Sequence, residues 1–430
     1  MTEERDMHAT GSSLLRRPLA VTLTITALVV VSTVFSAPAI WDAETASKVD
    51  FAVLTRPLSY LMGAPLFGAW DTLSLLTVSQ HYSVLATLIV GYTLFRLLAP
   101  KSSSSWLRRV GTEALRAFVA LCVLFGFYAA GMLVPRPMVG MRLTEADLVS
   151  VDFHSHTNYS HDGWSLFRAR RNRAWHERGG FDVAYVTDHY TWEGFDEARL
   201  DNPPRVGDRT TLLSGAEIRI HLRPTNILGD RDRYLFALDS ARVYMSPDSI
   251  AAGFARGGRP PTLLYTMPGG LRFVISFDER PSGVVGIELN DGSPRGLEQV
   301  KAERAQILAL ADSLNLAVVG AANLHGWGRT VASWSVMEVP GWQDLTPTQM
   351  GDVIEAELHE RRRNAVTVVE RRMPYHDGSR VKLVLTVPWL TWEHFRMLSW
   401  GERLSWLLWT AGFGVAAWVR RAGDLRSRSR

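Results

Sequence analysis

Six of the 12 histidines in the chain fall between residues 154 and 221, together with several acidic residues. Two of them, His154 and His156, stand two apart after an apolar run, so on a β-strand both imidazoles lie on one face and can bind one ion. Nearby carboxylates would supply hard oxygen ligands, one of which can bridge two ions. The candidate metal ligands are His154, His156, Asp162, His189, Glu217 and His325. These residue types in this spacing predict a centre for divalent metal ions.

Each of these residues also has an ordinary structural explanation. Asp162 could cap a helix, Glu217 could form a salt bridge, and the histidines could be hydrogen-bonded core residues. For the whole set the metal centre is the better interpretation, because the polar segments all follow apolar runs. A cysteine site is excluded, since the single cysteine, Cys122, lies within an uncharged stretch.

Short apolar runs alternate with amphipathic stretches from Leu148 onwards, which is typical of strands separated by helices. The predicted strands are 148–153, 181–186, 211–218, 272–277, 283–289, 316–321, 364–370 and 382–387. The predicted helices are 166–178, 298–314 and 346–362. Continuous apolar strands of this kind favour a parallel sheet covered on both faces, and a βα barrel is its natural closed form. The polar residues would then gather at the carboxyl ends of the strands, where such barrels carry their sites.

Four ordered motifs in this region resemble those of the polymerase and histidinol phosphatase (PHP) domain superfamily. They are DFHSHTNYSHDG (152–163), AYVTDH (184–189), LLSGAE (212–217) and AANLHG (321–326). The resemblance covers about Leu148 to Val369, roughly half of the chain. It implies an α/β fold with a distorted, TIM-like βα barrel of the PHP type, which holds two or three divalent metal ions, manganese, zinc or iron, and cleaves phosphate esters.

The resemblance also assigns individual residues. His154 and His156 match the first motif, His189 the second, Glu217 the third and His325 the end of the last. The acidic position of the first motif is filled by Asp162, with His161 as the alternative, because SHDG is one residue longer than the common SDG. Asp188, next to His189, is a further metal-ligand or supporting candidate.

The chain departs from the family pattern at three points. Asn323 stands where the last motif usually has Asp, and Asp278 follows a predicted strand where the family often has His-Pro. A histidine expected after the third motif is not evident, although His221 and Asn226 lie nearby. Fewer nitrogen ligands would favour manganese, magnesium or iron over a full zinc site, or leave one metal position weak.

Charged residues are absent from four stretches of the 430-residue chain, 18–40, 72–95, 117–135 and 404–419. About 20 apolar residues cross a bilayer as a helix, so we expect transmembrane helices at 18–40, 81–98, 117–135 and about 402–419, which excludes a simple soluble enzyme. The last is short, and a buried core helix is its rival. The first also resembles a cleaved signal peptide, although it is long for one. The Trp-rich stretch from 389 to 409 is typical of an interfacial belt.

Basic residues cluster before the first span, between the second and third, and after the fourth, and they predict that these three parts face the cytoplasm. The middle of the chain would then be periplasmic or extracellular on a multi-pass inner-membrane protein. If 57–70 also spanned, the middle would be cytoplasmic, but two basic clusters would then lie outside. The predicted organisation is a membrane region over 1–147, a metal-binding barrel over 148–386, and an interfacial segment, last span and basic tail over 387–430.

The sequence thus predicts a membrane-anchored, metal-dependent phosphoesterase that uses a metal-activated water and no separate side-chain nucleophile. Its partners would be a phosphorylated small molecule or envelope phosphodiester and the lipid membrane. Nucleic acid is not expected, because much of the arginine behind the net charge of +4 flanks the apolar runs. Arg329 could clamp a phosphate, and the arginines at 168–173 more simply form a solvated helix face. The alternative function is a degenerate barrel that binds a ligand as a sensor or scaffold without turnover.

Overall fold

The computed structural model describes residues 3–98, 106–220, 223–229, 260–267, 271, 283–372 and 379–428. It contains a ten-stranded sheet and a two-stranded ribbon made by β2 and β3. The strands are β1 (Ile40–Asp42), β2 (Ala52–Thr55), β3 (Gly140–Leu143), β4 (Leu148–Ser155), β5 (Val183–Val186), β6 (Thr211–Ile220), β7 (Arg223–Leu228), β8 (Thr262–Tyr265), β9 (Val284–Asp291), β10 (Ala317–Ala321), β11 (Ser333–Glu338) and β12 (Thr367–Arg371).

The large sheet has the order β1-β12-β11-β4-β5-β6-β7-β8-β9-β10 and curls until its last strand lies against β4, β11 and β12. Gly320 of β10 bonds to the Ser335 hydroxyl of β11 at 2.9 Å, and a parallel bridge joins Ser155 to Leu324. The sheet therefore curls toward a barrel, as predicted. It is mixed and not purely parallel: β1, β11 and β12 at one edge, and β7 in the middle, run antiparallel to their neighbours.

The apolar runs of the strands form the core of this barrel. Val149, Val151 and Phe153 alternate along β4 and pack in one cluster with Tyr185 and Ile287 from other strands. Because side chains alternate along a strand, these residues share the interior face. The histidines at the end of β4 therefore emerge at the rim of a rigid, fully packed core.

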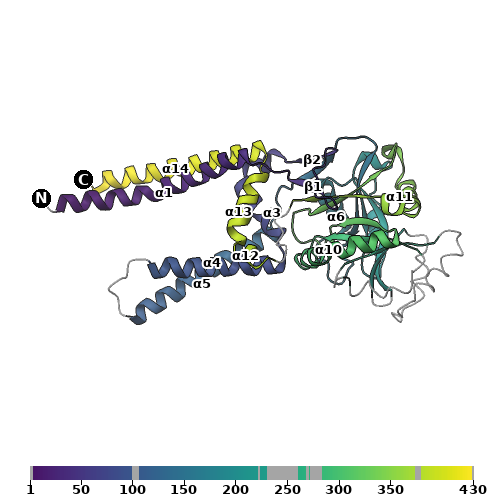
Figure 1. Cartoon of the computed structure of the whole chain (residues 1–430), viewed down its shortest axis with the longest axis horizontal. Helices are drawn as coiled ribbons and strands as arrows, with labels where there is room; N and C mark the ends of the chain where they lie inside the picture. The colour runs from purple at the N-terminus through teal and green to yellow at the C-terminus, as the bar shows by residue number, and fades with distance from the viewer. Residues whose placement is uncertain are drawn as a thin grey trace.

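The twelve described α-helices divide between the barrel and a helical part. They are α1 (Glu3–Val34), α2 (Leu58–Met62), α3 (Ala64–Ser74), α4 (Val78–Leu98), α5 (Trp106–Leu133), α6 (Ala169–Gly179), α7 (Glu193–Arg199), α10 (Pro294–Leu314), α11 (Pro347–Arg361), α12 (Arg380–Val384), α13 (Thr386–Met397) and α14 (Trp400–Arg428). Helices α6, α10 and α11 lie on the barrel (Figure 1). Helix α11 begins where the sequence predicted, because Thr346 and Gln349 form a capping box.

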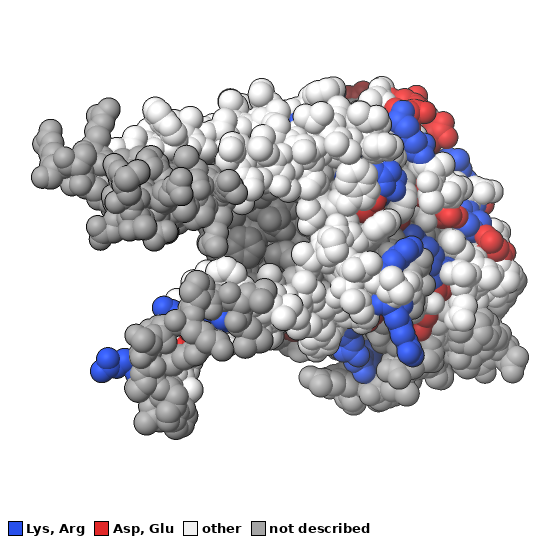
Figure 2. All heavy atoms as spheres, turned by 60° about the vertical axis from the view of Figure 1, so that its left-hand side comes forward, with Lys and Arg blue, Asp and Glu red and all other residues white. Residues whose placement is uncertain are grey.

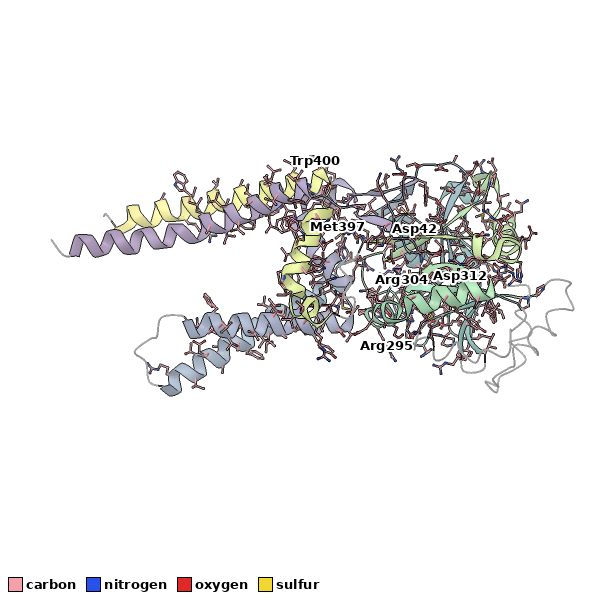
Figure 3. The ribbon with its side chains drawn as sticks, in the orientation of Figure 1. Asp42, Arg295, Arg304, Asp312, Met397 and Trp400 are labelled. Carbon is pink, nitrogen blue, oxygen red and sulfur yellow. The ribbon has the colours of Figure 1, made fainter. Side chains whose placement is uncertain are left out.

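The helical part consists of two arms that project from the same side of the barrel (Figure 1). One arm pairs α1 with α14 and carries both chain ends at its tip, and the other contains α4 and α5. Arg403 ties the first arm together by donating to Val29 O and Ser32 Oγ of α1. Figure 3 places Met397 and Trp400 where α13 meets α14, at the base of this arm.

The arms expose many apolar side chains close together, which is unusual for a surface that faces water. Leu404, Leu408 and Phe413 of α14 are 57%, 63% and 68% exposed, and Leu19 and Leu23 of α1 are similar. Figure 2 shows the visible arm surface as largely uncharged, with a few basic residues near the tip of one arm, whereas charges of both signs crowd the rounded domain. Contiguous exposed apolar surface of this kind marks contact with a partner or with lipid.

One helix in the described parts of the chain is both long and apolar enough to cross a membrane. It is the segment Val110–Leu133 within α5, and only 6% of its apolar window is buried. A shorter apolar helical stretch covers Leu19–Val34 in α1. The predicted span 18–40 is too long at its C-terminal end. Helix α1 stops at Val34, and β1 begins at Ile40 and pairs with β12.

The predicted strand at 382–387 is wrong. Its residues lie in α12 and α13, where the Ser379 hydroxyl caps α12 by accepting from Lys382 N. These helices pack against α4. The alternating β-branched pattern was misleading because the tertiary contact with α4 decides the local structure.

A buried ion-pair network, here called the junction cluster, joins the arms to the barrel. Asp71 of α3 bonds to Arg136 after α5 at 2.7 Å, and it contacts Arg371 of β12 at 3.3 Å. The hydroxyls of Tyr60 and Thr330 also donate to Asp71. The network therefore connects α2, α3, the end of α5 and two parts of the barrel through one carboxylate.

Candidate metal centre

The six candidate ligands converge at the carboxyl ends of the barrel strands. His154 ends β4 and His156 follows it, His189 follows β5, Glu217 lies in β6, and His325 follows β10. Three overlapping groups have ligand atoms within 4.8 Å of one another. The groups are His154, His156 and Glu217; His156, His189 and His325; and His161, Asp162 and His189. Together the residues His154, His156, His189, Glu217 and His325 are called the histidine cluster below.

Glu217 stands at the middle of the cluster. Its Oε2 lies 3.1 Å from His154 Nε2, 3.5 Å from His156 Nε2 and 3.3 Å from His189 Nδ1. The two Nε2 atoms of His154 and His156 are 2.9 Å apart. The side chains of His154, His156 and Glu217 are buried, so water does not screen the contacts among them.

The Nδ1 atoms of His154 and His156 already have hydrogen-bond partners. His154 Nδ1 lies 2.7 Å from Glu288 Oε1, so this nitrogen carries the proton. His156 Nδ1 lies 2.8 Å from Ser160 Oγ, whose own proton goes to Asp188 Oδ1. Nδ1 of His156 therefore donates to Ser160 Oγ, and the Nε2 atoms of both rings point toward the Glu217 carboxylate.

Three potential ligand atoms thus lie together, the Nε2 atoms of His154 and His156 and an oxygen of Glu217. Without a metal ion a proton on His154 Nε2 joins this ring to Glu217, and a bound cation would take the place of that proton. A further acceptor, Asn323 Oδ1, is buried beside the His156 ring. The donor set of His154, His156 and Glu217 therefore fits a divalent metal ion.

The outer part of the site is partly open. Asp162 Oδ2 lies 3.4 Å from His189 Nε2 and 3.3 Å from His325 Nε2, so it spans the two rings. His325 Nδ1 lies 3.0 Å from Asn323 O and donates to it, which turns Nε2 of His325 toward the cluster. His161 packs its ring on His189, with the ring centres 4.8 Å apart. Asp162 thus reaches both exposed histidines, whereas His161 approaches only one.

The charges of His154, His156 and Glu217 are set by their burial and by the charged groups around them. Burial opposes a charge on His154, but Glu288 and Glu217 outweigh it and raise its pKa well above the ordinary value. Burial and the neighbouring histidines lower the pKa of His156. Burial would raise the pKa of Glu217, but His154 and His189 outweigh it and lower that pKa, so this carboxylate is ionised. An anionic ligand at the centre favours a bound cation.

The remaining predicted residues support the site or lie outside it. The carboxylate of Asp188 accepts from Thr157 N at 2.6 Å and from the hydroxyls of Thr157 and Ser160, so it holds the loop that follows His156. Asn323 Nδ2 donates to Asp291 Oδ2 at 3.1 Å. Asn226 donates to Phe153 O. Asp278 and His221 lie outside the described residues.

Glu288 belongs to none of the four sequence motifs, yet it supports the site. This residue of β9 is fully buried, and it accepts from His154 Nδ1 and from Met267 N at 3.0 Å. A carboxylate behind a metal-binding histidine fixes its tautomer and orientation. Burial raises the pKa of Glu288 to about 7, although His154 opposes the shift. The signal was a lone Glu within the apolar run GVVGIEL, because a buried charge requires a partner.

A second buried pair, Asp152 and His176, lies behind the first strand of the site. Asp152 Oδ2 is 2.8 Å from His176 Nε2, and Asp152 Oδ1 accepts from His154 N and Ala322 N. His176 also contacts Asn172 O through Nδ1. The pair therefore links α6 to the two site segments, 152–156 and 321–325, although neither residue contributes a ligand atom to the groups above.

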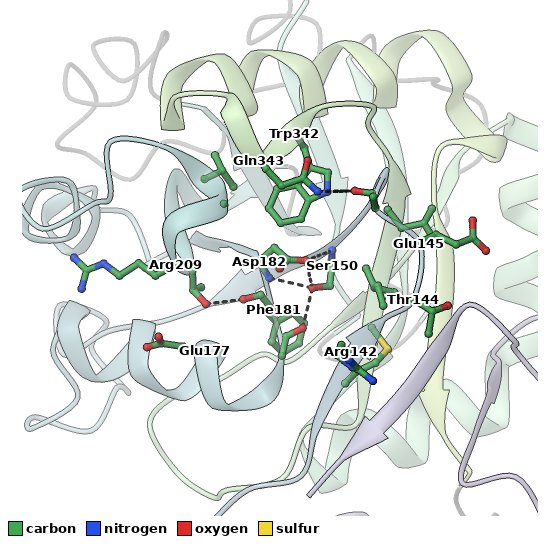
Figure 4. Close-up of a pocket in the computed structure, with 18 residues that line it drawn as sticks. Arg142, Thr144, Glu145, Ser150, Glu177, Phe181, Asp182, Arg209, Trp342 and Gln343 are labelled. Atoms are coloured by element: carbon green, nitrogen blue, oxygen red, sulfur yellow. Dashed lines mark hydrogen bonds between the residues drawn. The ribbon is translucent and has the colours of Figure 1, made fainter. Parts of the chain in front are cut away.

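A cavity of about 490 Å³ lies at the opposite ends of the same strands (Figure 4). It is lined by the starts of β4, β5 and β6, and Ser150 bonds there to Asp182 at 2.8 Å. Trp342 Nε1 donates to Ala146 O, and Thr210 donates to Phe181 O. These polar groups satisfy one another, so the cavity offers no unpaired ligand set comparable with the histidine cluster.

No protein-family model matches the sequence, and no curated protein matches it. Among solved structures the chain is similar to PsfC from Pseudomonas syringae, at 18% identity and a TM-score of 0.36, over 57% of this chain and 96% of that one. It is also similar to the lesion-specific endonuclease PfuEndoQ from Pyrococcus furiosus, at 12% identity and a TM-score of 0.36, over 49% of this chain and 56% of that one.

An amidohydrolase from Chromobacterium violaceum, with bound sulfate and no metal, is similar at 16% identity and a TM-score of 0.29, over 51% of this chain and 97% of that one. All three TM-scores lie below 0.5, so these likenesses decide neither the fold nor the activity. The site is therefore judged by its own geometry.

Proposed function

We propose that this chain is a membrane-anchored, metal-dependent phosphoesterase of the PHP type. The observation that carries the proposal is the convergence of the Nε2 atoms of His154 and His156 and the Glu217 carboxylate, whose ligand atoms lie within 4.8 Å of one another. The four ordered motifs of the PHP superfamily contain these residues. The donor set fits two or three divalent ions, and manganese, zinc and iron all accept imidazole and carboxylate ligands.

Different residues of the site would hold different metal ions. His154, His156 and Glu217 would hold the buried ion, and Glu288 would keep His154 in the tautomer that binds. His189, His325 and Asp162 would hold ions nearer the solvent. Divalent ions bound in such a site polarise a phosphoryl oxygen and lower the pKa of a water molecule to about 7. No separate side-chain nucleophile is then required.

The exposure of the ligands indicates where a substrate enters. The side chains of His154 and His156 are fully buried, whereas those of His189, His325 and Asp162 are 18%, 19% and 45% exposed. A phosphate ester would therefore approach from the side of Asp162, His189 and His325. The buried pair lies behind these residues and is closed to solvent.

The membrane part of the proposal is a four-span anchor with the barrel outside the cytoplasm. Helix α5 has the length and hydropathy of a span, α4 lies in the same arm, and α1 and α14 form the other arm with exposed apolar side chains. Both chain ends lie at the tip of the same arm (Figure 1), as expected if they share one side of the membrane. Trp400 is 77% exposed at the base of that arm, where an indole ring favours the headgroup region.

The enzymatic proposal is tested on the full chain purified in detergent. We expect close to two metal ions per chain and hydrolysis of bis(p-nitrophenyl) phosphate in added manganese, with activity lost in chelator and restored by manganese. A metal-loaded protein that cleaves no ester in a broad screen, yet binds a phosphorylated ligand, would point instead to a sensor or scaffold.

The topology is tested separately. Alkaline phosphatase fused after Arg372 should be active in a bacterial host, whereas a fusion after Arg428 should be inactive. A cytoplasmic reporter should give the reverse pattern at both positions. An active cytoplasmic reporter after Arg372 would contradict the orientation and restore the five-span arrangement with 57–70 as a span.

A further inference from the structure

Beside the metal centre lies a surface that combines stacked indole rings with clustered arginines. Trp164 and Trp327 stack with ring centres 5.4 Å apart, and Arg171 lies over the Trp164 ring at 5.8 Å. Trp164 N donates to His325 O at 3.0 Å, which joins this surface directly to a candidate metal ligand. The surface formed by Trp164, Arg171, Arg178, Trp327 and Arg329 is called the Trp–Arg surface.

The arginines of this surface gather without acidic partners. Arg171 and Arg178 are seven residues apart on α6, so they share one face of the helix. The half-buried Arg329 lies near both, and burial and the charges of Arg178, Arg136 and Arg171 lower its pKa. No carboxylate in the described residues pairs with Arg171, Arg178 or Arg329; Arg329 donates only to Gly328 O. Clustered guanidinium groups of this kind bind phosphate through paired donors.

The Trp–Arg surface also touches the end of the candidate membrane helix. Gly328 N donates to Met132 O at 3.3 Å, one residue before α5 ends at Leu133. Trp327 is 43% exposed and Met132 47% exposed at this contact. Thr330, in the same loop, is tied through Asp71 to Arg136, which follows α5. The loop is therefore held at the level where α5 would leave the hydrocarbon.

The composition of the Trp–Arg surface and its contact with α5 together indicate which class of ligand would bind there. Indole rings favour the headgroup region of a bilayer, and basic residues near a membrane surface attract anionic lipids. A soluble phosphate ester would need neither the exposed indole ring nor the fixed contact with α5. The Trp–Arg surface thus matches a phosphate group that is presented by the membrane.

We propose that the Trp–Arg surface binds the phosphate of an anionic lipid headgroup and delivers it to the adjacent metal centre. This proposal rests on the proposed phosphoesterase function and narrows its substrate class to membrane lipids. Arg329 and Arg171 would bind the phosphate oxygens, and Trp327 would lie among the headgroups. The acyl chains would remain in the bilayer beside the end of α5.

Lipid retention by the full chain tests the binding without requiring turnover. The protein is placed in nanodiscs of phosphatidylcholine with phosphatidic acid, in chelator, and bound lipid is counted by native mass spectrometry. We expect the wild type to retain phosphatidic acid in preference to phosphatidylcholine, and Arg329→Gln and Trp327→Ala to reduce that retention about fivefold or more. Arg170→Gln is the matched control: Arg170 lies on the same helix but acts on Asp201, and its loss should change nothing.

Two further measurements separate the alternatives. Oleate, an anion without phosphate, should not replace phosphatidic acid, and glycerol 3-phosphate should displace it only weakly. Equal displacement by glycerol 3-phosphate would indicate a site for free phosphate, and equal retention in wild type and Arg329→Gln would remove the surface from lipid binding; either result overturns the proposal.

In Arg329→Gln, with metal content unchanged, the loss of phosphatidic acid retention should exceed any loss of bis(p-nitrophenyl) phosphate hydrolysis. An equal loss in both measurements would mean that the arginine serves the metal centre for any phosphate and would overturn the lipid assignment. If the wild type retains phosphatidic acid as expected but hydrolyses no ester, the phosphoesterase function fails while the lipid-binding surface stands.

Discussion

The histidine cluster and the junction cluster are both largely buried and polar, but they contain different groups. In the junction cluster, the single carboxylate of Asp71 pairs with the guanidinium groups of Arg136 and Arg371 and accepts hydrogen bonds from two hydroxyls. In the histidine cluster, four imidazole rings and the Glu217 carboxylate converge. Burial of polar groups alone therefore does not identify a site. Converging imidazole nitrogens and a carboxylate do, because these are ligand types that divalent metal ions prefer.

The largest expected effect is on metal binding. His156→Ala or His154→Ala removes a ligand atom, so metal content should fall strongly and ester hydrolysis should fall to background. Metal is measured by elemental analysis of the full chain. His359→Ala on α11, whose ring contacts Thr262 at the other end of the barrel, is the control and should keep its metal. Equal metal in all three variants would exclude the two histidines as ligands.

His176→Ala would be a less suitable control for these ligand variants. Its ring holds Asp152, which in turn positions His154 N and Ala322 N.

Breaking the junction cluster should act on stability and not on metal binding. Asp71→Asn leaves Arg136 and Arg371 buried without their carboxylate, and removing one partner of a buried ion pair costs about 3–5 kcal/mol. We expect a clearly lower Tm in detergent, with metal content unchanged below the transition. Asp50→Asn, in an exposed pair with Lys48, should leave Tm nearly unchanged. Metal loss in folded Asp71→Asn would show that the two clusters are not independent.

The carboxylate of Asp71 also predicts that the stability of the protein depends on pH. Burial would raise the pKa of Asp71, but Arg371 and Arg136 outweigh it and lower that pKa. A lowered pKa contributes stability that is present above the unfolded value of about 3.9 and is lost as the pH falls through the folded value. The difference in Tm between wild type and Asp71→Asn should therefore shrink below about pH 4 and stay constant near neutrality. A difference that shrinks as the pH rises would contradict this assignment.

Glu288→Gln should have an intermediate effect on the histidine cluster. The amide keeps the size of the side chain but removes the charge that favours the Nδ1 proton of His154. Loss of such a supporting carboxylate typically costs about 10–100-fold in metal affinity. Metal titration of the chelated protein measures it, and Glu303→Gln, which changes the acceptor of Leu271 N, is the matched control. Unchanged affinity in Glu288→Gln would mean that Glu288 only fills the core.

The smallest effect is expected at Asn323. Asn323→Asp restores the carboxylate of the family pattern, but it also replaces the donor to Asp291 with a second negative charge. Metal affinity should rise a few-fold, whereas Tm in chelator should fall and recover when manganese is added. Asn315→Asp, also at a positive φ but at the end of α10, should show neither change. A Tm that does not respond to manganese would place residue 323 outside the metal centre.

Much of the barrel follows from local pattern. The runs at 148–153, 183–186 and 317–321 are strands because nearly continuous apolar residues must be covered on both faces. The order of polar residues after these runs already predicted that His154, His156, His189, Glu217 and His325 would meet. Whether they bind metal stays a prediction.

Other features were decided by tertiary contacts that no local pattern encodes. Residues 382–387 form helices because they pack on α4, and β1 joins the sheet across more than 300 residues of chain. The partner of His154 is Glu288, 134 residues away. The orientation of each ring, and so the set of nitrogens that face Glu217, depends on these distant partners. The amino-acid sequence by itself determined which ligands stand at the strand ends, and only the folded structure decided which of their atoms meet, because the hydrogen bonds that orient the rings come from residues far away in the chain.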